Sequence, residues 1–89
     1  MTFQVLLHPN AARFLEKTDT TITKRLKEHL KELRQAPEKK GERLKGSQFW
    51  RMRVEDHRVV YEIDRTRNRV IVPFIGHKRD VYDDFSRLL

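Results

Sequence analysis

The sequence contains no cysteine, and this absence excludes two kinds of site. Disulfides cannot form and zinc cannot be held by thiolates, so a reducing cytoplasm is the compartment we expect. The histidines, at positions 8, 29, 57 and 77, do not have the spacing of metal ligands. We therefore expect neither a metal site nor a cofactor.

Long apolar runs are also missing. No stretch approaches the roughly 18 residues that a membrane-spanning helix needs. The N-terminus, MTFQVLLHPN, lacks the basic start of a signal peptide. The chain has no carboxylate pair, nucleophile triad, Walker loop or glycine-rich dinucleotide motif. We expect no membrane partner and no nucleotide-cofactor chemistry.

Positive charge is abundant. The 89 residues include 20 lysines and arginines against 13 acidic residues, a formal net charge of +7. This length predicts a single domain over residues 1–89. The excess charge favours an anionic partner such as nucleic acid, an acidic protein or an anionic membrane surface. A merely solvated basic surface is the alternative, and charge alone does not separate the two.

The first part of the chain predicts a strand and two helices. The run Phe3 to Leu7 is β-prone, and Pro9 and Asn10 after it are helix-start residues. Asp19 is a cap for a second helix, which Pro37 ends. Apolar residues of that helix recur at spacings of four, four and three: Ile22, Leu26, Leu30 and Leu33. Residues 37–48 are interpreted as a polar connector.

Three strand-like runs follow, at residues 49–54, 57–64 and 69–75. A tight turn at Glu55-Asp56 would place Arg53 opposite Arg58, and a second hairpin would place Val59 opposite Phe74. One face of the sheet is then apolar and can be covered by the two helices. Its members are Trp50, Met52, Val59, Tyr61, Ile63, Val70, Val72 and Phe74. The predicted fold is α+β, with two N-terminal helices on a small, mainly antiparallel sheet (β-α-α-β-β-β) and a short C-terminal helix.

The opposite face of this sheet gathers Arg51, Arg53 and Arg58, and also His77 if the third strand continues unbroken. Like charges opposite each other destabilise a sheet, so the cluster favours a surface for phosphate. A solvated face, partly neutralised by Glu62, is the alternative. Pro73 indicates an edge or a bulge, and a bulge would reverse the orientation of His77.

The basic residues at the end of the sheet suit RNA cleavage by attack of a 2′-hydroxyl on the neighbouring phosphate. Arginines 51, 53 and 58 would stabilise the developing charge, and His77 is the candidate for proton transfer. Lys78 and Arg79 would bind phosphate, and Tyr82 would stack on a base or act as a weak acid. No divalent metal is required for this chemistry.

Four segments in this order, LKG at 44–46, WRMRV at 50–54, HRVVYEID at 57–64 and IGHKRDVY at 75–82, resemble the RelE/ParE toxin superfamily of type II toxin–antitoxin pairs. The resemblance covers nearly the whole chain. It implies a microbial-RNase-like fold, ribosome-dependent cleavage of mRNA in the A site, and neutralisation by a RelB-like antitoxin.

By position, the resemblance assigns catalytic roles to Arg51, Arg53, Arg58, His77, Lys78 and Tyr82, and substrate binding to Arg79 and Lys45. Well-known members have lysines where this chain has Arg51 and Arg53. The resemblance therefore implies that these two arginines stabilise charge, but it does not imply that they donate a proton. Two alternatives stay open. The ParE branch inhibits DNA gyrase without cutting RNA and generally lacks the basic–histidine–tyrosine set, and a third kind of relative would bind RNA without cutting it.

Overall fold

The computed structural model describes residues 2–80. Along the chain come β1 (Gln4–Leu7), α1 (Pro9–Lys17), α2 (Thr20–Glu32), α3 (Pro37–Lys40), β2 (Glu42–Arg43), β3 (Phe49–Val54), β4 (His57–Asp64) and β5 (Arg69–His77). The predicted C-terminal helix and Tyr82 lie outside the described residues.

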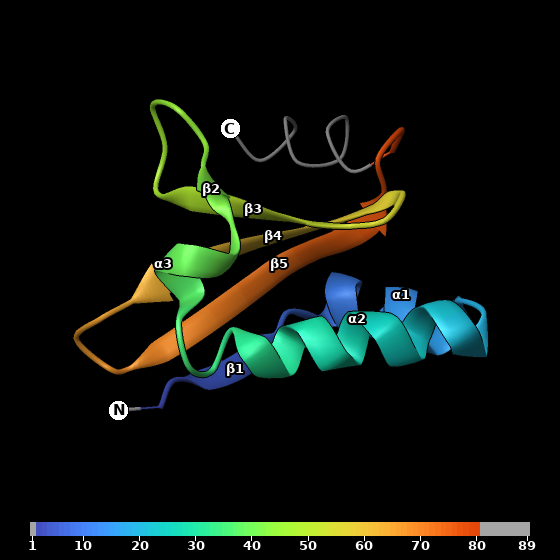
Figure 1. Ribbon diagram of the computed structural model, residues 1–89, viewed down its shortest axis with the longest axis horizontal. Helices are drawn as coiled ribbons and strands as arrows, with labels where there is room; N and C mark the ends of the chain where they lie inside the picture. Colours follow the sequence, from blue (N-terminus) through green and yellow to red (C-terminus); the bar gives the residue numbers. More distant parts are fainter. Residues whose placement is uncertain (1, 81–89) are drawn as a thin grey trace.

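The strands form one five-stranded sheet in the order β1-β5-β4-β3-β2. β1 pairs with β5 in parallel, and the other neighbours are antiparallel. Helices α1 and α2 lie together on one face of this sheet (Figure 1). The predicted α+β class, with two helices packed on a mainly antiparallel sheet, is confirmed. No helix in the described part of the chain has the length and hydropathy needed to cross a membrane.

The two main helices begin where the sequence predicts. At the start of α1, the Nδ1 atom of His8 accepts from the backbone N–H of Asn10 at 3.5 Å, and Pro9 takes the first helical position. At the start of α2, Asp19 accepts from the N–H of Thr21 at 2.8 Å. The apolar stripes of both helices pack on one face of the sheet; the buried residues of this core are Ala11, Leu15, Leu26, Leu30, Leu33, Met52, Val54, Val59, Tyr61, Val70, Val72 and Ile75.

Residues 37–48 are not merely a polar connector. They contain the one-turn helix α3 and the short strand β2. The hydroxyl of the buried Tyr61 donates to the carbonyl oxygen of Pro37 at 2.6 Å, and this bond holds α3 over the edge of the sheet. Burial also raises the pKa of Tyr61 to about 12, so the hydroxyl keeps its proton at neutral pH.

Strands β4 and β5 pair in two registers that differ by one residue. Near the turn, Asp64 lies opposite Arg69 as predicted, whereas further along Val59 lies opposite Ile75. Between these two points β5 has one residue more than β4, which makes a β-bulge. The extra residue falls in the segment that contains Pro73. Proline suits a bulge because it has no N–H to offer to the ladder.

The bulge overturns the predicted position of Phe74. Val59 lies opposite Ile75 rather than Phe74, and Ile75 takes the core position with 6% of its surface exposed. Phe74 lies opposite Val60 instead, on the face that points away from α1 and α2. There it joins a small second apolar cluster with Val60, Leu44 and Phe49.

In an unbroken strand, the side chain of His77 would point to the same face as the three arginines. The bulge in β5 turns it to the opposite face. His77 lies directly opposite His57, which shares its strand face with the core residues Val59 and Tyr61. His77 is therefore on the helix-covered side of the sheet, as expected for a strand with a bulge before Gly76, and it does not join the three arginines.

Candidate nucleic-acid interface

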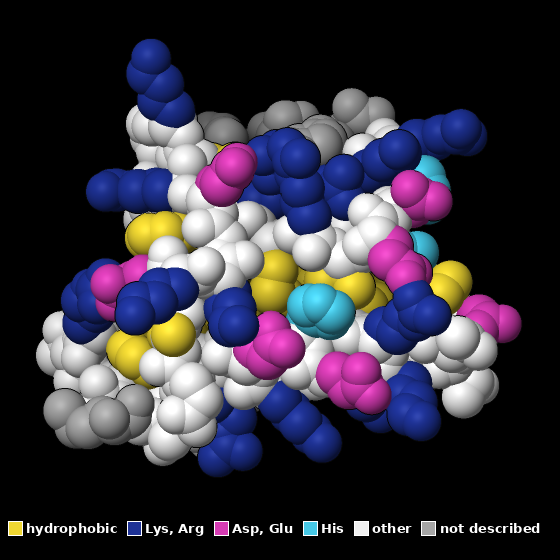
Figure 2. All heavy atoms as spheres, in the orientation of Figure 1, with side chains coloured by type: hydrophobic (Ala, Val, Ile, Leu, Met, Phe, Trp, Pro, Cys, Tyr) yellow, Lys and Arg dark blue, Asp and Glu magenta, His cyan; other side chains and the backbone are white. Residues whose placement is uncertain are grey.

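Three arginines project from the sheet face that is turned away from α1 and α2, which we call the arginine face. Arg53 of β3 lies directly opposite Arg58 of β4, as predicted, and Arg51 lies two residues before Arg53 on β3. Figure 2 shows lysine and arginine side chains gathered in a band along β3. Successive residues of a strand point to opposite faces of the sheet. Residues 51, 53 and 58 alternate with the core residues of β3 and β4, so their side chains all point away from the core.

Arg51 is positioned by β2, an element that the sequence did not reveal. Glu42 lies opposite Arg51 in the β2–β3 ladder, and its carboxylate oxygen Oε2 is 2.8 Å from Nη2 of Arg51. Only 17% of the Arg51 side chain is exposed, against 71% for Glu42. The pair holds the guanidinium in a defined place and offsets part of its charge.

Arg58 is held in a different way, by backbone oxygens. Its Nη1 atom donates to the carbonyl oxygens of Glu55 and His57, each at 2.8 Å. Glu55 adopts a left-handed φ of 56°, as tight hairpin turns require, and this bend presents its carbonyl oxygen to the guanidinium. Within residues 2–80 no carboxylate pairs with Arg58 or Arg53, so both keep their full charge for an anionic ligand.

A basic hollow of about 280 Å³ opens beside Arg51 and Arg53. Its other lining residues are Lys39, Lys40, Gly41 and Glu42, from α3 and the start of β2. Four cationic side chains therefore surround the hollow, with one carboxylate. Lys39 and Lys40 were not among the residues predicted from the sequence for this site. The signal for them is the basic run in PEKKG, but only the close approach of Gly41 to the backbone of Arg51 shows that this run reaches the arginines.

The structure places Lys78 beside the β3–β4 turn. Its backbone N–H donates to the carbonyl oxygen of Asp56 at 2.8 Å, and its Nζ atom lies 3.6 Å from the Asp56 carboxylate. Arg58 is the second residue of β4, just after this turn, so Lys78 and Arg58 lie at one end of the arginine face. Arg79 is exposed next to it, with its backbone N–H donating to Nδ1 of His77 at 3.2 Å.

His77 forms a pair with His57 away from the arginine face. The two rings meet edge-on, with centroids 5.6 Å apart, and the ring of Phe14 lies 5.8 Å from His57. Burial, and secondarily the neighbouring His77, lower the pKa of His57. The predicted proton-transfer group is thus separated from the arginines by the sheet itself.

Lys45 lies far from this turn. It is exposed in the loop between β2 and β3, just ahead of Phe49, whereas Arg58 lies beyond the other end of β3. Strand β3 alone spans about 17 Å at 3.3–3.4 Å per residue. The structure therefore does not bring Lys45 together with Arg58 and Lys78. Among residues 2–80 no group of three His, Cys, Asp or Glu side chains could hold a metal ion.

The arrangement offers strong binding of phosphate oxygens and stabilisation of negative charge. Guanidinium groups bind phosphate through parallel hydrogen bonds and stay charged at any physiological pH. Arg51 and Arg58 are already held by short contacts, so little conformational freedom is lost when a ligand arrives. Anchored cations of this kind are what the transition state of a phosphoryl reaction needs.

Comparisons with known proteins agree with this fold. A family model described as the ParE toxin of type II toxin–antitoxin systems matches residues 5–82. A double mutant of the Escherichia coli toxin RelE, solved in the free state, has a TM-score of 0.78 and 23% identity, with all of both chains covered.

Two complexes with antitoxins are also similar. The RelBE2 complex from Mycobacterium tuberculosis has a TM-score of 0.78 and 22% identity, covering 86% of this chain and 99% of that one. The archaeal RelE–RelB complex from Pyrococcus horikoshii has a TM-score of 0.76 and 22% identity, covering 90% and 99%. A comparison with curated proteins gives no match.

Proposed function

Because the chain belongs to the ParE toxin family of type II toxin–antitoxin systems, within the RelE/ParE superfamily, we propose that it is a toxin that cuts mRNA on the ribosome. The observation that carries this proposal is the arginine face. Arg53 and Arg58 lie opposite each other on two paired strands, with no carboxylate partner for either among the described residues.

The proposed reaction is transesterification of the RNA backbone. The 2′-oxygen forms a bond to the neighbouring phosphorus while the bond from phosphorus to the 5′-oxygen breaks, leaving a 2′,3′-cyclic phosphate and a 5′-hydroxyl. One proton leaves the 2′-oxygen and one reaches the 5′-oxygen. Arg51, Arg53 and Arg58 stabilise the charge that builds up on the phosphate oxygens, and Lys78 extends the phosphate contact at the turn.

Proton transfer is not assigned to His77, because that side chain lies on the helix side of the sheet. The arginines do not fill the role, since a guanidinium group holds its proton too tightly to act as a base. Tyr82, the other titratable residue that the resemblance indicates, lies outside the described residues. The proposal therefore rests on positioning and charge stabilisation.

We also propose a RelB-like antitoxin as the protein partner. The similar structures from M. tuberculosis and P. horikoshii are complexes of a RelE-type toxin with its antitoxin. A chain of net charge +7 would attract an acidic partner, which would mask the arginine face or compete with RNA for it.

The second candidate function is inhibition of DNA gyrase without RNA cleavage, and the ParE family model favours it. Induced expression separates the two functions. Cleavage predicts primer-extension stops inside reading frames and arrested translation, whereas gyrase inhibition predicts intact transcripts and reduced DNA supercoiling.

Arg58→Ala tests the site. We expect mRNA cleavage to fall by about a hundredfold or more, as when one charge-stabilising donor is removed from an active site, while antitoxin still copurifies. The control is Arg67→Ala, which removes an exposed arginine from the turn between β4 and β5. Equal cleavage by both variants and wild type would remove Arg58 from the site.

A further inference from the structure

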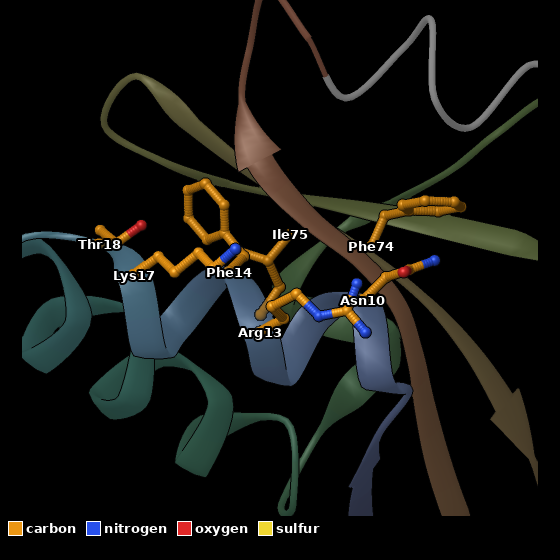
Figure 3. Close-up of a pocket in the computed structure, with 7 residues that line it drawn as sticks. All are labelled: Asn10, Arg13, Phe14, Lys17, Thr18, Phe74 and Ile75. Carbon is orange, nitrogen blue, oxygen red and sulfur yellow. The ribbon is translucent and has the colours of Figure 1, made fainter.

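A second basic hollow lies at the β5 edge, between that strand and α1 (Figure 3). Its volume is about 620 Å³. The lining residues are Asn10, Arg13, Phe14, Lys17, Thr18, Phe74 and Ile75, none of them acidic. We call it the α1 hollow. None of its residues belongs to the site proposed above.

The α1 hollow exists because β5 is longer than its neighbour. β1 pairs with β5 only as far as Val72, and in the described part of the chain no strand continues that edge beyond it. α1 crosses below this edge and supplies the other wall (Figure 1). The bulge turns Phe74 away from the core at the same place.

Phe74 connects the hollow to the arginine face. Its side chain lines the α1 hollow, yet it also packs against Val60, which lies on the arginine face two residues from Arg58. Such positions on one strand face are separated by about 7 Å. A ligand that leaves the arginine face over the edge of β5 therefore meets the ring of Phe74 first and the hollow next.

The polar groups of the hollow suit a nucleotide. Arg13 and Lys17 lie one turn apart on α1, both exposed, and neither forms an ion pair within residues 2–80. The side chain of Asn10 lies on the Phe74 side of the hollow together with that of Arg13 (Figure 3). An amide offers both a donor and an acceptor, the combination that reads the edge of a base.

We propose that the α1 hollow binds a nucleotide of single-stranded RNA that flanks the phosphate held on the arginine face. Arg13 and Lys17 contact the backbone phosphates, Phe74 stacks on the base and Asn10 hydrogen-bonds to its edge. This inference rests on the proposed RNA-cleaving function. It adds that the protein holds RNA over the sheet edge, and that the identity of the flanking base affects binding.

The test measures binding of an RNA of about ten nucleotides with 2′-O-methyl groups throughout, which cannot be cut. We expect Arg13→Ala/Lys17→Ala to weaken binding about tenfold and to reduce the slope of log affinity against log salt by about 1.4, since each single-strand phosphate contact contributes about 0.7. Phe74→Leu keeps an apolar side chain against Val60 but cannot stack. It should weaken binding roughly fivefold or more without changing the salt slope.

The matched control is Lys27→Ala/Lys31→Ala, which removes two exposed cations of the same spacing from α2. Equal weakening by the control would show that only net charge matters and would overturn the inference. Normal RNA binding together with reduced antitoxin binding by Arg13→Ala/Lys17→Ala would overturn it in favour of an acidic protein ligand.

If Arg58→Ala stops cleavage while the hollow variants bind RNA normally, the inference fails and the proposed function stands. If wild-type protein neither binds nor cuts RNA, both fail.

Discussion

Arg53 and Arg58 face each other across β3 and β4, an arrangement that a sheet selected only for stability would avoid. Arg58 is fixed by two backbone oxygens, which hold the guanidinium without neutralising it. Arg53 is exposed and has no carboxylate partner among the described residues. The repulsion between the two is a cost that a bound phosphate removes, since its oxygens can accept from both side chains.

Replacement of Arg53 should therefore make the free protein more stable. Arg53→Thr removes the repulsion and inserts a residue that favours strands. We expect the free energy of unfolding to rise by about 0.2–1 kcal/mol at low salt, while RNA cleavage falls. Chemical denaturation, compared with wild type, measures the change.

The control for Arg53→Thr is the same stability measurement repeated at high salt. At 1 M salt the Debye length is about 3 Å, so the repulsion is screened and the stability difference should shrink. A gain that persists unchanged in high salt would point to strand propensity instead of charge. A loss of stability at low salt would contradict the account of Arg53.

At the scale of elements, α3 brings Lys39 and Lys40 to the arginine face because Gly41 allows close packing. A Cβ atom at Gly41 would lie 2.5 Å from the Tyr61 hydroxyl oxygen and 2.6 Å from the carbonyl oxygen of Arg51. The second of these is backbone of β3, which cannot move aside easily. The absence of a side chain at position 41 therefore keeps α3 against the sheet.

Gly41→Ala should push α3 away from β3. We expect it to cost about 1–3 kcal/mol of unfolding free energy, as overpacking usually does, and to lower RNA affinity because Lys39 and Lys40 move from Arg51 and Arg53. Gly46→Ala is the comparison. Gly46 has a φ of 77° and nothing within 4 Å of the added Cβ, so its cost of about 1 kcal/mol comes from the backbone alone.

RNA affinity distinguishes these two glycine variants. Gly46→Ala should bind RNA normally at a temperature where it is fully folded, whereas Gly41→Ala should not. Equal RNA affinities in the two folded variants would mean that the position of α3 does not matter to the ligand.

Some features of the helices and strands could be predicted from the sequence, and others could not. Helix starts, the bounds of β3 and β4 and the β3–β4 register follow from capping residues and from the alternation of apolar and polar positions. The register beyond Pro73 did not follow, because a bulge shifts every later side chain by one position and periodicity does not say where it falls. α3 has four residues and β2 two, too short for any period to be recognised.

At the scale of the whole molecule, the sheet separates the main core from the arginine face that we propose binds RNA. One face packs against α1 and α2 and contains most of the core, whereas the other bears the three arginines around a small apolar cluster. The sequence predicted the cluster of arginines because their strand positions are local and free of the bulge. It left the orientation of His77 open, because that orientation depends on whether a bulge falls at Pro73.

The salt dependence of RNA binding tests this division for the molecule as a whole. Five cationic residues line the arginine face and its hollow: Arg51, Arg53, Arg58, Lys39 and Lys40. If each contacts a phosphate of single-stranded RNA, these five alone contribute about −3.5 to the slope of log affinity against log salt, and the proposed contacts of Lys78, Arg13 and Lys17 make it steeper. Raising salt fourfold should then weaken binding by about a hundredfold or more, measured by fluorescence anisotropy with an uncleavable RNA. Replacing any one of the five by alanine should reduce the slope by about 0.7, whereas Arg67→Ala should leave it unchanged. A wild-type slope shallower than about −1 would show that the arginine face is not the RNA contact, and would favour the gyrase-inhibitor reading of the fold.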